Sequence, residues 1–175
     1  MNKRILPLIL GHEFCGEIVE VGEGVNSLDI GQRVLSKHLV SCGRCEDCLG
    51  DKPYACKISR LKTLGLRRNG GFAKYALVPA DHSMILPEHI PYEIAVLTQP
   101  MVLAANAVNR AGLKIGDKVV VLGPGLIGLL TLVAAINDGA TKELVVGLSG
   151  DGKRLEIAKT IGATQIVNAD LGDSS

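Results

Sequence analysis

Residues 118–128, KVVVLGPGLIG, decide the fold. The apolar run from Lys118 to Leu122 predicts a buried strand, which Gly123-Pro124-Gly125 then breaks. The apolar residues 126–137 that follow have the length of a helix. The pattern G-x-G-x-x-G is common by chance, but between a strand and a helix it indicates a dinucleotide-binding turn.

Each glycine of this turn has a separate expected task. Gly123 permits the tight bend, Gly125 lets a pyrophosphate approach the backbone, and Gly128 lets the helix pack closely on the strand. A glycine turn that binds no ligand is the competing interpretation. The predicted cofactor-binding residues of the turn are Gly123, Pro124, Gly125, Leu126, Ile127 and Gly128.

Downstream of the turn, strands and helices alternate. The patterns predict strands at 143–146 and 165–167, with a helix at 153–161 between them. Such alternation is typical of a parallel α/β sheet, so residues 112–175 are interpreted as the first half of a doubly wound domain. The strand at 118–122 is then an open edge. We expect uncovered apolar side chains at Leu129, Leu130, Leu132 and Val133 unless other elements cover them.

The end of the second strand bears on the choice of nicotinamide cofactor. An acidic residue there hydrogen-bonds the ribose of NAD, but in this chain Ser149 is expected at that position. Arg154, with Lys153 beside it, could face the 2′-phosphate of NADP; alternatively, both charges are simply solvated in the first turns of a helix. The sequence gives a slight preference for NADP over NAD.

Upstream of residue 112 the patterns change. Strands are predicted at 17–21, 33–36 and 72–78, and a helix from 92 to 109 with a break at Pro100. The fold class is therefore α/β with a mostly β N-terminal part. The change of pattern at Gly112 predicts domains at 1–111 and 112–175.

Four of the five cysteines lie within one short polar stretch. Cys42, Cys45, Cys48 and Cys56 have the spacing C-x2-C-x2-C-x7-C, and together they can bind one tetrahedral zinc ion. With all four positions filled by protein, such a zinc is structural. A thioredoxin-type motif needs only one C-x-x-C pair. An iron–sulfur cluster uses similar spacings, but its usual motif has proline after the last cysteine, where this chain has Lys57.

Residues 11–25 contain a second candidate site. Gly11-His12-Glu13, with Gly16, Gly22 and Val25, has the form G-H-E-x2-G-x5-G-x2-V. Taken alone, a His-Glu pair is most simply an imidazole with ordinary hydrogen bonds. The cysteine stretch that follows soon after it favours a functional interpretation instead.

Together these segments resemble the zinc-containing medium-chain alcohol and polyol dehydrogenases. Residues 11–25 match the family signature, residues 42–56 are similar to its structural zinc loop, and residues 71–73 and 78–80 resemble its G-G-F-A-x-Y-x-x-V-P-A strand. The sequence is more similar to the sorbitol, threonine and polyol branch than to the liver alcohol dehydrogenases. The resemblance implies a partial GroES-like catalytic domain followed by a truncated Rossmann domain.

The resemblance also implies a reaction. His12 would be a ligand of a catalytic zinc, and Glu13 a ligand or a carboxylate close to it. Such a zinc binds the substrate hydroxyl and stabilises the alkoxide while hydride passes to the nicotinamide. The implied function is that of a zinc-dependent NAD or NADP oxidoreductase acting on a small alcohol or polyol.

Two departures from the family pattern affect the catalytic zinc. The Cys-Gly-Ser/Thr-Asp segment that supplies the family's first ligand does not occur, and Cys15 is expected to be a small buried residue instead. Gln99 stands where the polyol branch often has glutamate. We therefore expect zinc to bind weakly or not at all at His12 and Glu13.

Family members are longer than this chain, so the resemblance implies an internal fragment with no turnover of its own. The alternative is a non-catalytic zinc-binding remnant of such an enzyme. A zinc-free relative such as a quinone oxidoreductase is disfavoured, because those relatives lack the four-cysteine lobe. Full-length relatives are expected to be homo-oligomers.

Composition limits the remaining partners and the location. The 19 Lys and Arg nearly balance 18 Asp and Glu, and aromatic residues make up only 3%, so nucleic-acid binding is not expected. The N-terminal MNKRILPLIL lacks a signal-peptide cleavage site, and the glycine turn breaks the uncharged run 119–137, so no membrane segment is expected. Cysteines without a secretory signal favour a cytoplasmic location.

Overall fold

The computed structural model describes residues 6–58 and 62–171, so part of the basic, apolar N-terminal segment lies outside the described residues. Contacts divide the chain into two compact units, Met1–Leu97 and Thr98–Ser175. The sequence places a domain boundary later, at 111/112. Helix α4 (Thr98–Ala111) lies between the predicted and the observed boundary, and its contacts place it in the second unit.

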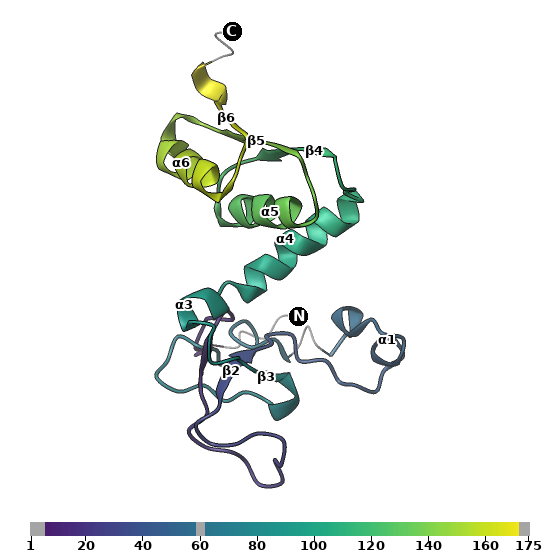
Figure 1. Cartoon of the computed structure of the whole chain (residues 1–175). Helices are drawn as coiled ribbons and strands as arrows, with labels where there is room; N and C mark the ends of the chain where they lie inside the picture. The colour runs from purple at the N-terminus through teal and green to yellow at the C-terminus, as the bar shows by residue number, and fades with distance from the viewer. Residues whose placement is uncertain (1–5, 59–61, 172–175) are drawn as a thin grey trace. The chain divides into compact units, whose positions relative to one another are not determined.

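The first unit is built on a small antiparallel sheet in the order β1-β2-β3 (Figure 1). Its strands are β1 (Cys15–Glu17), β2 (Arg33–Ser36) and β3 (Ser83–Ile85). The prediction for β2 is confirmed. The prediction for 17–21 is only partly right, because the strand ends at Glu17 while Ile18 still donates to the Gln32 carbonyl at 2.9 Å.

The strand predicted at 72–78 is wrong. Residues 72–78 are irregular, and the apolar side chains of Phe72, Tyr75 and Leu77 are largely exposed. A strand is stable only where a neighbouring strand takes up its backbone hydrogen bonds. Among residues 6–58 and 62–171, no strand pairs with this segment, so its apolar pattern lacks the partner that would fix it.

The helical region after residue 91 is interrupted earlier than the sequence suggests. Helix α3 (Tyr92–Ala95) ends before residues 96–97, and α4 begins at Thr98. Pro100 is therefore the third residue of α4 and does not break it. In the first turn of a helix an N–H has no intrahelical acceptor, so proline removes no hydrogen bond there.

The second unit contains a parallel sheet in the order β4-β5-β6. The strands are β4 (Lys118–Leu122), β5 (Lys142–Gly147) and β6 (Gln165–Asn168), joined by α5 (Leu126–Asn137) and α6 (Gly152–Ile161). Short 3-10 turns, η3 (Ser149–Asp151) and η4 (Ala169–Leu171), follow β5 and β6. Every one of the predicted strands and helices from residue 118 onward is confirmed.

The core of this unit lies between one face of the sheet and its two crossover helices. Val121 and Val145 from the sheet pack with Leu132 of α5 and with Leu155 and Ala158 of α6. Leu132, expected to be uncovered unless other elements pack on it, is therefore covered by the sheet, and Leu129 also packs against this cluster. A second cluster joins α4 to α5 through Val108, Ala134 and Ala135.

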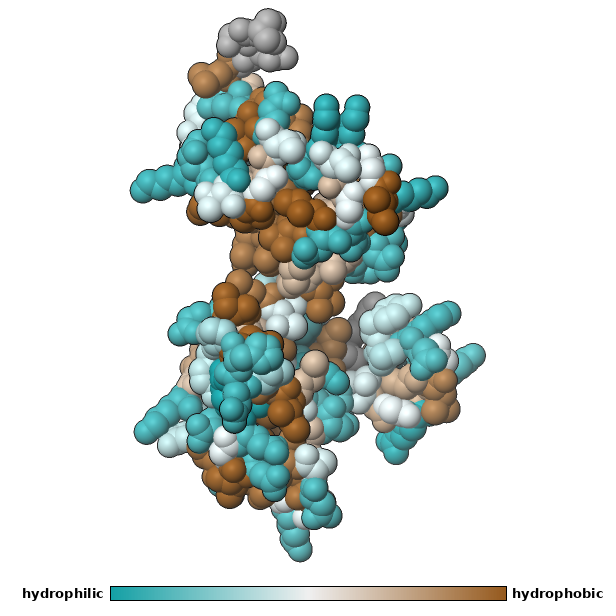
Figure 2. Space-filling model, viewed as in Figure 1, coloured by the Kyte–Doolittle hydropathy of each residue, from teal (hydrophilic) through white to brown (hydrophobic). Residues whose placement is uncertain are grey.

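Strand β4 lies at the edge of the sheet, as expected. Its side chains Val120 and Leu122 are 58% and 79% exposed, so uncovered apolar surface gathers at this strand. Figure 2 shows apolar residues at the surface beside hydrophilic ones. No helix in the described part of the chain is long and apolar enough to cross a membrane.

Candidate metal centres and nucleotide-binding turn

The cysteine stretch folds into a short loop with one helical turn. Cys45 caps α1 (Glu46–Leu49), Cys48 lies within it, and Cys56 follows the 3-10 turn η1 (Pro53–Ala55). The sequence predicted no regular element here. One turn of helix nevertheless fits, because residues three apart on a helix face the same side and so bring Cys45 and Cys48 together.

The four thiols surround a common point. Their sulfur atoms all lie within 4.8 Å of one another, with 3.5 Å between Cys45 and Cys48 and 3.9 Å between Cys42 and Cys48. A tetrahedral zinc with Zn–S bonds of about 2.3 Å separates its sulfurs by about 3.8 Å. The residues present therefore fit a closed four-thiolate zinc site.

The four thiols also perturb one another's titration. A hydrogen bond from the Arg44 backbone lowers the pKa of Cys42. The pKa of Cys45 is raised to about 12: a backbone hydrogen bond from Cys48 lowers it, but the Cys48 thiol, burial and the other two thiols together raise it. Neighbouring thiols therefore compete for one another's protons, and a bound cation would favour their ionised forms.

A close crossing of backbone segments positions the histidine–glutamate pair. Gly11, with φ +97°, directly precedes the pair, and its carbonyl accepts the Gly71 N–H at 2.9 Å. A Cβ at Gly70 or Gly65 would lie 1.9 or 2.1 Å from that carbonyl oxygen. The glycine pair at 70–71, just before the strand predicted at 72–78, allows this segment to pass directly over Gly11.

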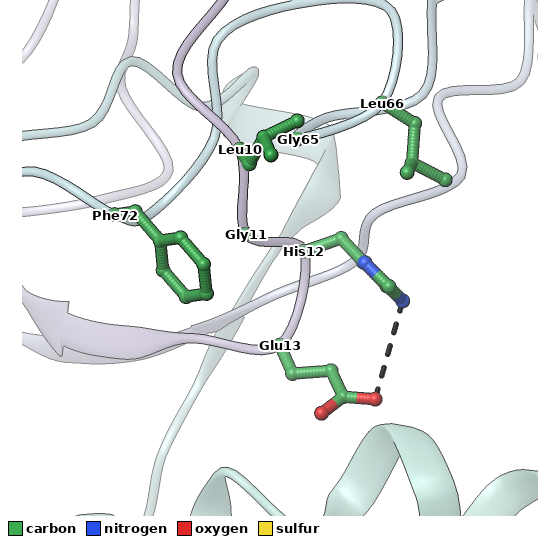
Figure 3. A pocket seen from close by; sticks show the side chains of 7 residues that line it. All are labelled: Leu10, Gly11, His12, Glu13, Gly65, Leu66 and Phe72. Atoms are coloured by element: carbon green, nitrogen blue, oxygen red, sulfur yellow. Dashed lines mark ion pairs between the residues drawn. The ribbon is translucent and has the colours of Figure 1, made fainter.

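The pair lines a pocket of about 300 Å³ (Figure 3). His12 and Glu13 project to the same side, with 4.0 Å between Nε2 and Oε1. The remaining wall is mostly apolar, so the pocket joins two potential metal donors to a surface that suits a carbon chain. Its lining residues are Leu10, Gly11, His12, Glu13, Gly65, Leu66 and Phe72.

A second imidazole, which the sequence analysis missed, lies beside His12. The ring centroids of His12 and His38 are 5.2 Å apart. Burial, and then the nearness of His12, lower the pKa of His38, so its ring is neutral near pH 7. The pairing of the two strands explains why the rings meet. β1 pairs Cys15 with Leu35 in the antiparallel sense, so moving three residues back from Cys15 and three residues forward from Leu35 brings His12 opposite His38. The strand pairing had to be known before this contact could be inferred from the sequence.

The sequence also singled out Cys15 and Gln99. Cys15 is half-buried, its thiol donates to the Tyr92 carbonyl at 3.5 Å, and burial raises its pKa. It therefore remains a protonated thiol. Gln99 lies in α4, and its buried Oε1 has no hydrogen-bond partner in the described part of the chain.

The glycine turn has the geometry expected for each of its glycines. Gly123 adopts φ +94° and donates its N–H to the Val146 carbonyl at 2.8 Å. Gly125 caps α5, and a Cβ at either position would meet nothing within 4 Å. A Cβ at Gly128 would lie only 1.9 Å from the Gly123 oxygen. The turn is thus closely packed where Gly128 of α5 meets Gly123, and open where a side chain would project from Gly123 or Gly125.

Two carboxylates hold the loop that follows β5. Ser149 donates its N–H to Asp170 at 2.7 Å, and Leu148 donates to Asp151 at 3.1 Å. Arg154 donates to the other oxygen of Asp151 at 3.0 Å, so it is already paired. The sequence analysis missed Asp170, which lies two residues beyond β6. Its position could have been inferred, because the carboxyl ends of parallel strands meet at one edge of the sheet.

Known proteins are similar over nearly the whole chain. The alcohol dehydrogenase GroES-like domain family matches residues 1–88. The sorbitol dehydrogenase of Halalkalibacterium halodurans is 41% identical over 95% of this chain and 48% of its own length. An L-threonine 3-dehydrogenase of Chelativorans sp. is 35% identical over 94% of this chain and 46% of its own length.

Two solved structures with bound nicotinamide cofactors are also similar. One, a Sinorhizobium meliloti protein described as a zinc-binding dehydrogenase and bound to NADP, has a TM-score of 0.88 and 34% identity, covering 96% of this chain and 48% of that chain. The other, described as an Escherichia coli short chain alcohol dehydrogenase (rspB) in complex with NADH, has a TM-score of 0.82 and 36% identity, covering 93% and 48%.

This chain spans about half the length of the curated relatives it matches. The resemblance seen in the His-Glu segment, the cysteine loop and the glycine-rich strand is confirmed by these similarities. The chain belongs to the zinc-containing medium-chain alcohol and polyol dehydrogenases, the family that contains the alcohol dehydrogenase GroES-like domain.

Proposed function

We propose that the chain is part of a zinc-dependent oxidoreductase that transfers hydride between an alcohol or polyol and NAD or NADP. Residues 1–111 would form a partial GroES-like catalytic domain and residues 112–175 the first half of a Rossmann domain. The observation that carries the proposal is the turn from β4 into α5, where Gly123 and Gly125 leave open space above the backbone. The NADP- and NADH-bound relatives support this cofactor class.

The start of α5 has the properties of an anion site. The first N–H groups of a helix have no acceptor within the helix, and the helix dipole favours negative charge at this end. Residues 126–128 provide these groups, and the open turn before them lets a pyrophosphate come close. A Cβ at Gly125 would occupy the space that the pyrophosphate needs.

The loop after β5 would contact the adenosine ribose. Ser149 is the second residue after β5, and Asp170 supplies a carboxylate beside it. Arg154 could bind a 2′-phosphate, although it would have to share or leave its contact with Asp151. A carboxylate favours NAD and an arginine favours NADP, so both cofactors belong in the test.

Two metal positions complete the proposal. Cys42, Cys45, Cys48 and Cys56 would hold a structural zinc that organises their loop. His12 and Glu13 would hold a catalytic zinc, which when bound supplies a Lewis acid for the substrate hydroxyl. The apolar wall of the pocket beside this pair would orient the carbon chain of the substrate.

Binding of nicotinamide cofactor tests this proposal. The chain has no tryptophan, so NADH fluorescence can be followed without interference from protein emission. We expect NADH or NADPH to bind, and Gly125→Ala to weaken binding about tenfold, because the new methyl group meets the pyrophosphate rather than the protein. Gly22→Ala, also in open space but far along the chain, is the control. Failure of both cofactors to bind, or equal binding by Gly125→Ala, would contradict the proposal.

A non-catalytic zinc-binding protein is the second candidate. The neutral side chain of Gln99, whose Oε1 has no hydrogen-bond partner among the described residues, favours it. On this alternative the purified chain binds about one zinc and produces no NADH or NADPH from sorbitol, threonine or butanediol. A reproducible rise in NADH absorbance with sequence-verified protein would exclude it.

A further inference from the structure

We propose that His38 is a third protein donor to the metal ion that His12 and Glu13 would hold. The inference rests on the proposed function in one respect, because it requires a metal ion at that pair. It changes the expectation from the sequence, which predicted weak binding from one missing ligand and a neutral Gln99.

The backbone holds His38 opposite His12. Strands β1 and β2 are antiparallel, and their register continues beyond the strands, since the Ser36 N–H donates to the Phe14 carbonyl at 3.2 Å. Two further residues along each segment lead to His12 and His38. The His38 carbonyl also accepts the Leu64 N–H at 3.0 Å, so a third segment fixes this position.

The separation of the rings fits two imidazoles on one metal ion. The centroids of His12 and His38 are 5.2 Å apart, with an angle of 53° between the ring planes. Two imidazoles bound through nitrogen to one tetrahedral zinc, at Zn–N distances of about 2.0–2.1 Å, have centroids about 5 Å apart. Glu13 Oε1 is 4.0 Å from His12 Nε2, close to the separation of about 3.3 Å between two donors on one zinc.

The three side chains must still close around the ion. Within the described residues, the four cysteines are the one set of three or more potential ligands whose donor atoms already converge. His12, Glu13 and His38 are all partly exposed, so their side-chain torsions can change without disrupting a packed core. Two imidazoles and one carboxylate are a donor set found in catalytic zinc sites, and they leave one position open.

The other histidines are excluded from this role by their surroundings. His82 is buried, and its two ring nitrogens contact Asp81 and the Ser41 N–H. His89 is exposed on the surface. His89 therefore provides a matched control, because its loss removes an imidazole without touching either metal position.

A simple ring contact is the competing explanation, since aromatic rings pair at about 4.5–7 Å without any metal. Metal binding separates the two explanations. The full chain is first loaded with one equivalent of zinc, which four thiolates take up in preference to cobalt. Cobalt(II) is then titrated in, and its visible absorption reports on the second site. We expect one cobalt per chain in the wild type and in His89→Ala, and binding weakened at least about tenfold in His38→Ala.

A cysteine at position 38 gives a direct test of contact. In His38→Cys, with the four-thiolate site already filled by zinc, we expect a thiolate-to-cobalt charge-transfer band that the identically loaded wild type lacks; such a difference shows that residue 38 binds the metal. Equal cobalt affinity in His38→Ala, no such band in His38→Cys, or no cobalt uptake by the wild type would each overturn the assignment. NADH binding measured on the same samples tests the proposed function separately, so the two can fail independently.

Discussion

Both ring nitrogens of His82 make hydrogen bonds, one to its neighbour Asp81 and one to the segment that leads into the cysteine loop. Its Nδ1 lies 2.7 Å from an Asp81 oxygen, and its Nε2 lies 3.1 Å from the Ser41 nitrogen. The Ser41 amide can only donate, so Nε2 must be the acceptor and Nδ1 carries the proton. Its carbonyl also accepts the Lys37 N–H at 2.8 Å. Residue 82 therefore fixes the backbone on both sides of His38: its main-chain carbonyl holds Lys37, and its ring holds Ser41, immediately before Cys42.

Removing this side chain should loosen the loop. We expect His82→Ala to lower the free energy of unfolding by roughly 1–3 kcal/mol, because the half-buried Ser41 amide loses its hydrogen-bond acceptor. His89→Ala, an exposed histidine, should change it by less than about 0.5 kcal/mol. Urea denaturation of the zinc-loaded chain measures both. Equal stability of the two variants would contradict the role given to His82.

Single residues differ in how much of their role the sequence reveals. The cysteines could be assigned to one group from their spacing alone, because neighbours along the chain must also be neighbours in space. His38 could not, since its nearness to His12 depends on how two strands pair. Asp170 likewise contacts Ser149 only because β5 and β6 lie side by side.

Among the elements, α5 and β4 were predicted to the residue, whereas residues 72–78 were assigned to a strand that does not form. The strand, bend and helix around the glycine turn could be predicted because each depends on residues that are adjacent in the sequence. Residues 72–78 have strand-like composition but need a partner from elsewhere. Strand β3 (Ser83–Ile85) shows the converse, because its pairing with β2 rather than its composition makes it a strand.

The packing of α5 on the turn before it gives a prediction for this element. Gly128→Ala should destabilise the second unit by about 1–3 kcal/mol, because the new Cβ would lie 1.9 Å from the Gly123 oxygen and force the helix to shift. Gly152→Ala, in α6, meets nothing within 4 Å and has helical backbone angles. It should stabilise by about 0.4–1 kcal/mol.

Thermal unfolding followed by circular dichroism compares the two variants. Opposite shifts in Tm are expected, although the change from glycine to alanine is the same. If both variants shifted in the same direction, close packing at Gly128 would not be the cause.

The two units of the molecule are stabilised differently. In the described part of the chain, the apolar clusters around Val121 and Val108 belong to the second unit, whereas the first unit buries scattered apolar residues such as Leu35, Leu64 and Leu86. The first unit has a three-stranded sheet and long irregular segments. Small units with little core depend on metal ions or other cross-links for stability, so the thiolate site should contribute much of the stability of the first unit.

Metal removal should therefore affect the two units unequally. After treatment with EDTA under reducing conditions, we expect backbone amides of residues 42–56 to lose protection from hydrogen exchange, while residues 118–147 keep theirs. Mass spectrometry of peptides before and after chelation measures this. Uniform loss across the chain, or no loss at 42–56, would contradict the structural role of the metal. Restoring zinc should restore protection.

The exposed edge of strand β4 leaves backbone hydrogen-bonding groups without a neighbouring strand among the described residues. Within residues 6–58 and 62–171, its outer side faces no other strand, so every second amide and carbonyl there is open to water. Val120 and Leu122 add an apolar surface next to these groups. A further strand with complementary backbone groups would pair at this edge and cover these two side chains. A lysine at position 120 would oppose such pairing by placing charge on the new interface.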